Sequence, residues 1–201
     1  LVDERGRDEW ISTPSDKEET PLTRAIMCLR PGSVEIVRLL LEAKASLTAS
    51  KMHPMMLALH VGSIEIVDLL LDLGGVRVND DLQSGGSMVQ GAFKTALFHP
   101  NIDTHFDWSA GTKPTIAQRV ACIEKFLTTA YGPTSATCSL DDARSMLLLQ
   151  ACMTGTGDLV YFLLYELLVD PNRDASTRPS IPLRFHRTGV PLFAACRHGH
   201  F

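Results

Sequence analysis

Two groups of side chains in this sequence have the residue types of a metal or acid–base site. Near the carboxyl end, Cys196, His198 and His200 alternate in a C-x-H-x-H run. Thiolate and imidazole groups are ligands that zinc prefers, but a structural zinc site needs four of them in a closed tetrahedron. Residues two apart on a helix point in different directions, and no second cluster completes the set. We therefore expect no metal at this run.

The second group lies between residues 99 and 114, where histidines, aspartates and aromatic residues gather. Its members are His99, Asp103, His105 and Asp107, with Phe98, Phe106 and Trp108 beside them. Such side chains can ligate a metal or transfer protons, but their spacing fits no known ligand pattern. An aromatic loop that packs on its own domain is the simpler interpretation. The sequence also lacks a phosphate-binding glycine loop and a nucleophile elbow, so we expect no catalytic residues and no cofactor.

The elements that would position these groups are pairs of short helices. The segment His53–Gly74 contains two apolar-periodic runs, MMLAL and IEIVDLLLDL, separated by Gly62. Pro54 suits the first turn of a helix, and a glycine suits the left-handed residue that follows the end of one. A helix pair of this length is unstable alone and has more apolar surface than it can bury. It needs neighbours of the same kind.

Similar segments recur along the chain. The run SVEIVRLLL at 33–41 matches SIEIVDLLL at 63–71, and Pro21 precedes Pro54 by 54 − 21 = 33 residues. Further matches are ACMTGTGDLVYFLL at 151–164 and PLFAACRHGH at 191–200. This pattern resembles the ankyrin repeat, which reads TPLHLAA, then GH, EIV and an LLL run, with a period of about 33 residues. The resemblance predicts an all-α ankyrin-repeat solenoid.

We expect about five helix-pair repeats in one domain spanning 20–201, after a polar lead-in at 1–19. Their approximate ranges are 20–50, 51–79, 80–132, 133–172 and 173–201. The third repeat is degenerate, with helices expected at about 88–98 and 115–130 around an insertion at 99–114. The fifth stops before its second helix, so we expect the chain to be a fragment of a larger protein. The register also makes Leu40 and Leu70 equivalent buried positions.

Composition limits the function classes. A formal net charge of −4 argues against nucleic-acid binding. The most apolar run, Leu159–Val169, is too short to span a membrane and is interpreted as a buried helix. The five cysteines show no paired spacing, and Cys152 and Cys196 fall where the ankyrin pattern has small core residues. Free buried thiols fit an intracellular protein, either cytoplasmic or nuclear.

The resemblance implies non-enzymatic recognition of another protein, on the concave surface formed by hairpin tips and inner helices. Carried over by position, the partner-binding residues are Lys51, Met52, His60, Val61, Met153, Thr154, Arg197 and His198. The match is blurred at Leu29 and Arg30. Two alternatives stay open: a scaffold that presents the 99–114 insertion as a ligand or metal site, and a regulatory domain that holds a neighbouring domain of a larger enzyme.

Charge is distributed unevenly along the chain. From Arg173 to Phe201 there are five arginines and one acid, Asp174, which gives 5 − 1 = +4. The remaining residues then carry 14 − 22 = −8. Such asymmetry attracts an acidic partner to one end and acts mainly on the association rate. We expect an acidic protein segment to bind along His60, Met153, Arg197 and His198.

Overall fold

The computed structural model describes residues 12–15, 19–28, 30–76, 81–82, 86–87, 113–129, 139–173 and 190–199. The helix expected at 88–98 and residues 99–112 of the insertion lie outside these ranges. The chain divides into two compact units, residues 1–126 and 127–201.

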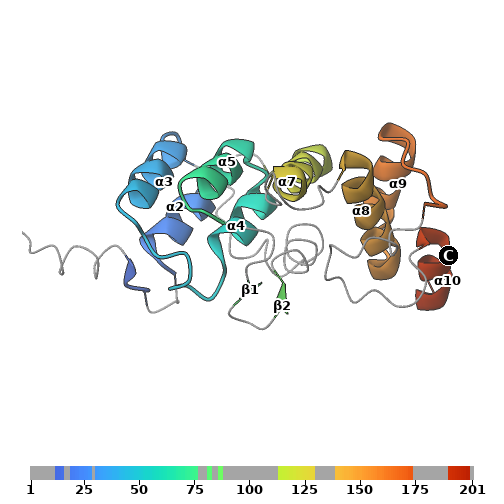
Figure 1. Ribbon diagram of the computed structural model, residues 1–201, viewed down its shortest axis with the longest axis horizontal. Coiled ribbons are helices and arrows are strands. Elements are labelled where there is room, and N and C mark those ends of the chain that lie inside the picture. Colours follow the sequence, from blue (N-terminus) through green and yellow to red (C-terminus); the bar gives the residue numbers. More distant parts are fainter. Residues whose placement is uncertain are drawn as a thin grey trace, which may run out of the picture. The chain divides into compact units, whose positions relative to one another are not determined.

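The first unit contains two stacked helix pairs (Figure 1). The first pair is α2 (Pro21–Cys28) and α3 (Ser33–Glu42), and the second is α4 (Pro54–Val61) and α5 (Ile64–Asp72). The inner helices α2 and α4 pack together, and so do the outer helices α3 and α5. This stacking is what the predicted helical repeat requires, because each pair buries its apolar face against the next.

Helix ends in the second pair follow from local chemistry. His53 comes directly before Pro54, the first residue of α4. Its Nδ1 atom accepts a hydrogen bond from the Met55 N–H at 3.1 Å. The Ser63 hydroxyl accepts from the Ile66 N–H at 3.4 Å and caps α5. Between them Gly62 takes a left-handed conformation with φ of 67°. Two short helices can therefore reverse direction within two residues.

Beyond these pairs, the first unit holds a short hairpin and most of a longer helix. Strands β1 (Asp81–Leu82) and β2 (Gly86–Ser87) pair antiparallel, with Asp81 opposite Ser87. They are the one departure from helical structure among the described elements. Helix α7 (Ile116–Thr129) lies where the second helix of the third repeat was expected. Lys125 on α7 forms an ion pair with Asp68 on α5 at 3.1 Å.

Leu40 and Leu70 occupy equivalent positions in the repeat but differ in how far they are buried. Leu70 is fully buried, as predicted, whereas Leu40 is only half-buried. Helix α5 has described neighbours in α3, α4 and α7, while the described neighbours of α3 are α2 and α5. The prediction for Leu40 is wrong in degree, because a repeat position is buried only as far as its neighbours cover it.

The second unit contains α8 (Leu140–Thr154), α9 (Gly157–Tyr161), the π-helical turn η3 (Phe162–Glu166) and α10 (Pro191–His198). Helix α8 packs against α9, η3 and α10. It begins with a capping box, in which the Ser139 hydroxyl accepts from the Asp142 N–H at 3.1 Å and the Asp142 carboxylate accepts from the Ser139 N–H at 3.3 Å. These reciprocal bonds fix where α8 starts.

The run Leu159–Val169 is not the buried helix that its composition suggested. Only Leu159, Leu163 and Val169 are buried, while Tyr161, Tyr165 and Leu168 are exposed. The helix ends at Glu166 through η3, and Leu168 then adopts a left-handed conformation. Large apolar side chains therefore stand on the exposed face of this run as well as on its buried face. None of the described helices combines the length and the apolar character that a bilayer span requires.

Replacing Gly62 with alanine is expected to destabilise the first unit by ~2–3 kcal/mol, because two costs combine. The left-handed φ disfavours a side chain, and the new Cβ would lie 2.9 Å from the Cβ of Pro114. Gly32 is the matched control, since its φ is 89° but a Cβ added there would meet nothing within 4 Å. Urea unfolding should show Gly32→Ala to cost ~1 kcal/mol, the conformational part alone. Equal losses for both variants would contradict the close contact at Gly62.

Candidate recognition surface

Among the described residues, three inner helices are each followed by a left-handed glycine. Helices α4, α8 and α10 are followed by Gly62, Gly155 and Gly199, with φ values of 67°, 72° and 73°. The two residues before each glycine form the last turn of their helix. The predicted surface pairs therefore occupy equivalent structural positions: His60 and Val61, Met153 and Thr154, Arg197 and His198.

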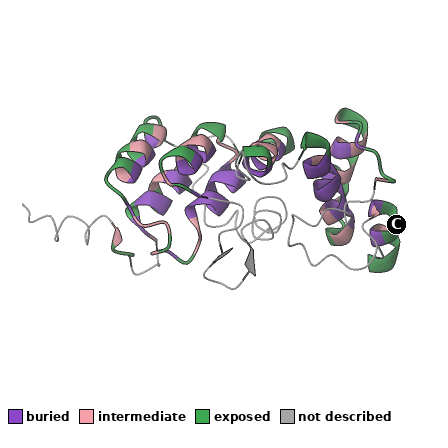
Figure 2. Cartoon of the chain, in the orientation of Figure 1, coloured by how far each residue is buried: buried purple, intermediate pink, exposed green. Residues whose placement is uncertain are grey.

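In the first unit, His60 and Val61 do not lie on the surface. Their side chains are 1% and 5% exposed, and all eight residues of α4 are buried (Figure 2). The expectation of an exposed pair is wrong here because α4 packs against α2 and α5, while the segment around Pro114 lies close against Gly62. The local sequence could not show this covering segment.

The hairpin tip before α4 is open to solvent. Lys51 is exposed and Met52 is half-exposed. The Ser50 hydroxyl donates to the Met52 carbonyl at 2.7 Å, which closes the turn that presents both side chains. Of the two residues where the pattern blurred, Arg30 is exposed and Leu29 lies outside the described residues.

In the second unit, the two predicted pairs lie on helices that pack together. Thr154, Arg197 and His198 are exposed, and Met153 is half-buried. Helix α10 contacts α8, so the four residues belong to one pair of neighbouring helices. Arg197 and His198 stand in the last turn of α10, where the helix dipole favours positive charge.

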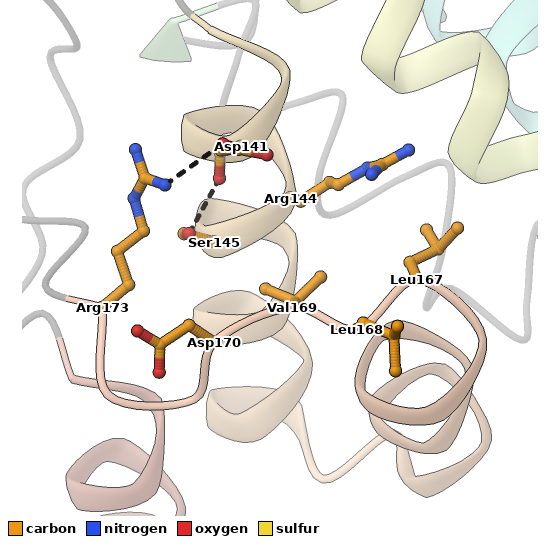
Figure 3. A pocket seen from close by; sticks show the side chains of 8 residues that line it. All are labelled: Asp141, Arg144, Ser145, Leu167, Leu168, Val169, Asp170 and Arg173. Carbon is orange, nitrogen blue, oxygen red and sulfur yellow. Dashed lines mark hydrogen bonds and ion pairs between the residues drawn. The ribbon is translucent and has the colours of Figure 1, made fainter.

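A small hollow lies beside the start of α8 (Figure 3). Its volume is about 160 Å³, and eight residues line it. They are Asp141, Arg144, Ser145, Leu167, Leu168, Val169, Asp170 and Arg173. Ligand pockets usually measure about 300–1,000 Å³, so this hollow is too small to hold a typical ligand. Its polar groups are also engaged in structural contacts.

Arg173, which lines the hollow, forms its main contacts with two aspartates of α8. Its guanidinium donates to the Asp142 carboxylate at 2.8 Å. It also lies 3.5 Å from the Asp141 carboxylate (Figure 3). The basic segment 173–201, which includes Arg173, was expected from the sequence to attract an acidic partner. That interpretation is wrong for this residue, because two aspartates of α8 already neutralise it. The other arginines between 174 and 189 lie outside the described residues.

The described cysteines are free thiols in different surroundings. Cys122 and Cys152 are buried, whereas Cys196 is exposed, which corrects its expected core position. Burial, together with the charge of Asp68, raises the pKa of Cys122 to about 12. Burial also raises the pKa of Cys152. Both thiols therefore stay protonated at neutral pH and act as small apolar residues rather than nucleophiles. No group of three or more potential metal ligands occurs within the described ranges.

The stacked helix pairs and their glycine-ended inner helices agree with a match to known proteins. Residues 4–81 match a family model described as ankyrin repeats in three copies. Over these residues the chain is similar to the ankyrin-repeat family. The match begins inside the segment 1–19 and ends at the first strand of the β hairpin. No curated protein matches the sequence. Ankyrin repeats are generally protein-interaction modules and are typically non-enzymatic.

Proposed function

We propose that this protein recognises another protein through its hairpin tips and the ends of its inner helices. In the first unit the recognition residues are Lys51 and Met52. In the second unit they are Met153, Thr154, Arg197 and His198. The observation that carries the proposal is that these exposed or half-exposed side chains stand on a turn and on helix ends, next to helices whose apolar residues are buried. A rigid scaffold lowers the entropy cost of binding.

The partner segment is acidic at the second unit. Arg197 and His198 are both exposed at the end of α10, and the permanent positive charge of Arg197 attracts carboxylates from a distance. Such charges act more on the association rate than on the final affinity. The proposal also places the protein inside the cell, because Cys28, Cys122, Cys152 and Cys196 are free thiols.

The test begins with affinity capture by the intact chain and identification of the bound protein by mass spectrometry. Binding of that partner is then measured for Arg197→Gln and for a matched control, Lys44→Gln. Lys44 is exposed at the end of the outer helix α3, so both variants lose one surface charge. Arg197→Gln should slow association about 2- to 5-fold and weaken its salt dependence. Equal effects of the two variants would show that only net charge matters, and would overturn the proposed surface.

A further inference from the structure

The outer face of α9 and η3 carries an exposed stripe of one acidic and three large side chains. Asp158, Tyr161 and Tyr165 follow one another at spacings of 3 and 4 residues along α9 and η3, and Leu168 stands in the left-handed turn that follows η3. Tyr161 is 59%, Tyr165 66% and Leu168 81% exposed. We call these four residues the α9 stripe. It lies on an outer helix, apart from the inner-helix ends proposed above.

The repeat itself supplies a comparison for the stripe. Gly155 and Val169 match Gly62 and Val76 with the same offset, 155 − 62 = 169 − 76 = 93. The stripe on α9 and η3 therefore corresponds to Glu65, Asp68, Asp72 and Gly75 on α5. The like positions on α3 hold Glu35, Arg38 and Glu42, and both glutamates form ion pairs with Arg38. Helix packing thus does not demand tyrosine or leucine at these positions.

Leu168 is unusual in its backbone as well as in its exposure. Its φ is 51°, a left-handed conformation that is unfavourable for a branched apolar residue. The same turn after α5 uses Gly75, with φ of 67°, and the turn after α3 uses Lys44, with φ of 60°. In all three turns a buried residue follows, namely Val169, Val76 or Ala45. The fold therefore accepts glycine at this position, and leucine both strains the turn and exposes a large apolar side chain.

The chemistry around the stripe favours a basic ligand. Tyr161 and Tyr165 lie with ring centroids 4.7 Å apart and tilted by 31°, and tyrosine ring faces attract cations, arginine above all. Asp158 and Glu166 are exposed beside them, and within the described residues neither carboxylate forms an ion pair. From 139 to 173 the chain carries two basic and five acidic residues, or 2 − 5 = −3. On α5, Asp68 of the corresponding stripe already holds the Lys125 ammonium group at 3.1 Å.

We propose that the α9 stripe docks a basic segment of a partner protein, in which arginine or lysine stands next to an apolar residue. The cationic group lies over the tyrosine rings and is held by Asp158 and Glu166. The apolar residue packs against Leu168. A peptide with this alternation satisfies both halves of the surface at once. An anionic surface or segment would meet the exposed carboxylates and be repelled.

Two synthetic peptides of equal length test the proposal with the intact chain. One alternates arginine with leucine and the other alternates glutamate with leucine, and binding of each is followed by fluorescence anisotropy. The arginine peptide should bind and the glutamate peptide should not. Tyr165→Ala and Leu168→Gly leave the net charge unchanged, and each should weaken the arginine peptide about 3- to 10-fold. These variants separate the stripe from general attraction to an acidic protein.

Leu168→Gly also guards against mistaking a folding defect for lost binding. Because glycine accepts the left-handed turn, this variant should keep or raise the midpoint of thermal unfolding while it loses peptide affinity. Lys44→Gly is the matched control, since it relieves the same backbone conformation after α3 and should leave affinity for the arginine peptide undiminished.

Four results would overturn the proposal. The arginine peptide could fail to bind, or the chain could prefer the glutamate peptide. Leu168→Gly could bind the arginine peptide as tightly as the unchanged chain does, or the chain could self-associate in a way that Leu168→Gly abolishes. The last would show that the occupant of the α9 stripe is a second copy of the protein, not a basic partner segment.

Discussion

Replacing Leu70 with alanine is expected to lower the free energy of unfolding by ~2–5 kcal/mol, the usual range for a buried leucine. The side chain of Leu70 is fully buried on α5, which packs against α3 and α4. Its removal leaves a cavity that the surrounding helices cannot fill without moving. Since each helix pair depends on its neighbours, the loss should also lower the stability of the adjacent pair.

Leu73→Ala is the control for that measurement. Leu73 follows α5 directly and is 47% exposed, so its truncation should change stability by less than ~0.5 kcal/mol. Both variants are compared by urea unfolding followed by circular dichroism. A change below ~0.5 kcal/mol for Leu70→Ala would mean that this face of α5 does not form the core and that the repeat register is wrong.

Replacing Asp142 with alanine should destabilise the second unit by ~1–3 kcal/mol. The Asp142 carboxylate accepts from the Ser139 N–H at 3.3 Å and from the Ser139 hydroxyl at 2.7 Å. It also accepts from Arg173 at 2.8 Å. The variant loses a helix cap and leaves the arginine without its closest partner. Because Arg173 is itself 36% exposed, solvent reduces the contribution of the ion pair.

Asp141→Ala provides the neighbouring control. The side chain of Asp141 is 70% exposed, and its carboxylate lies 3.5 Å from Arg173. We expect it to cost less than ~1 kcal/mol, as exposed ion pairs do. Thermal unfolding of both variants at low and high salt distinguishes the two roles. If Asp141→Ala and Asp142→Ala were equally destabilising, the capping box would not be what holds the start of α8.

Local sequence signals were enough to predict the bounds of α4, α5 and α7. Pro54 and Gly62 fix α4, because proline suits a first helical turn and glycine suits a left-handed residue after the last. The repeated SIEIV pattern predicts α5, and the amphipathic run after Thr115 predicts α7. These signals work because each depends only on residues a few positions apart, where backbone geometry decides the outcome.

Burial could not be predicted in the same way, since it depends on segments distant in sequence. His60 and Val61 have the positions of surface residues in the pattern, yet their helix is enclosed on all sides. Arg173 lies 173 − 142 = 31 residues from Asp142, so no local spacing reveals their ion pair. Cys196 fits a core position in the pattern but is exposed in α10.

Tyr161, Tyr165 and Leu168 show a signal that the sequence did contain. Their apolar character suggested a buried helix, but the alignment with 65–75 places them opposite charged residues and glycine. A position that is charged in one repeat is a solvent position in the next, unless a neighbour covers it. Comparing the repeats position by position, instead of by composition, would have identified the exposed stripe.

Hydrogen–deuterium exchange of the chain is measured with and without its captured partner. The proposal under test is that this protein binds through its hairpin tips and inner-helix ends. It predicts slower exchange on binding in peptides that contain Met52, Thr154 and His198, with the fully buried amides of α4 unchanged. Protection confined to the outer helices α3 and α5, with none at those three residues, would contradict it.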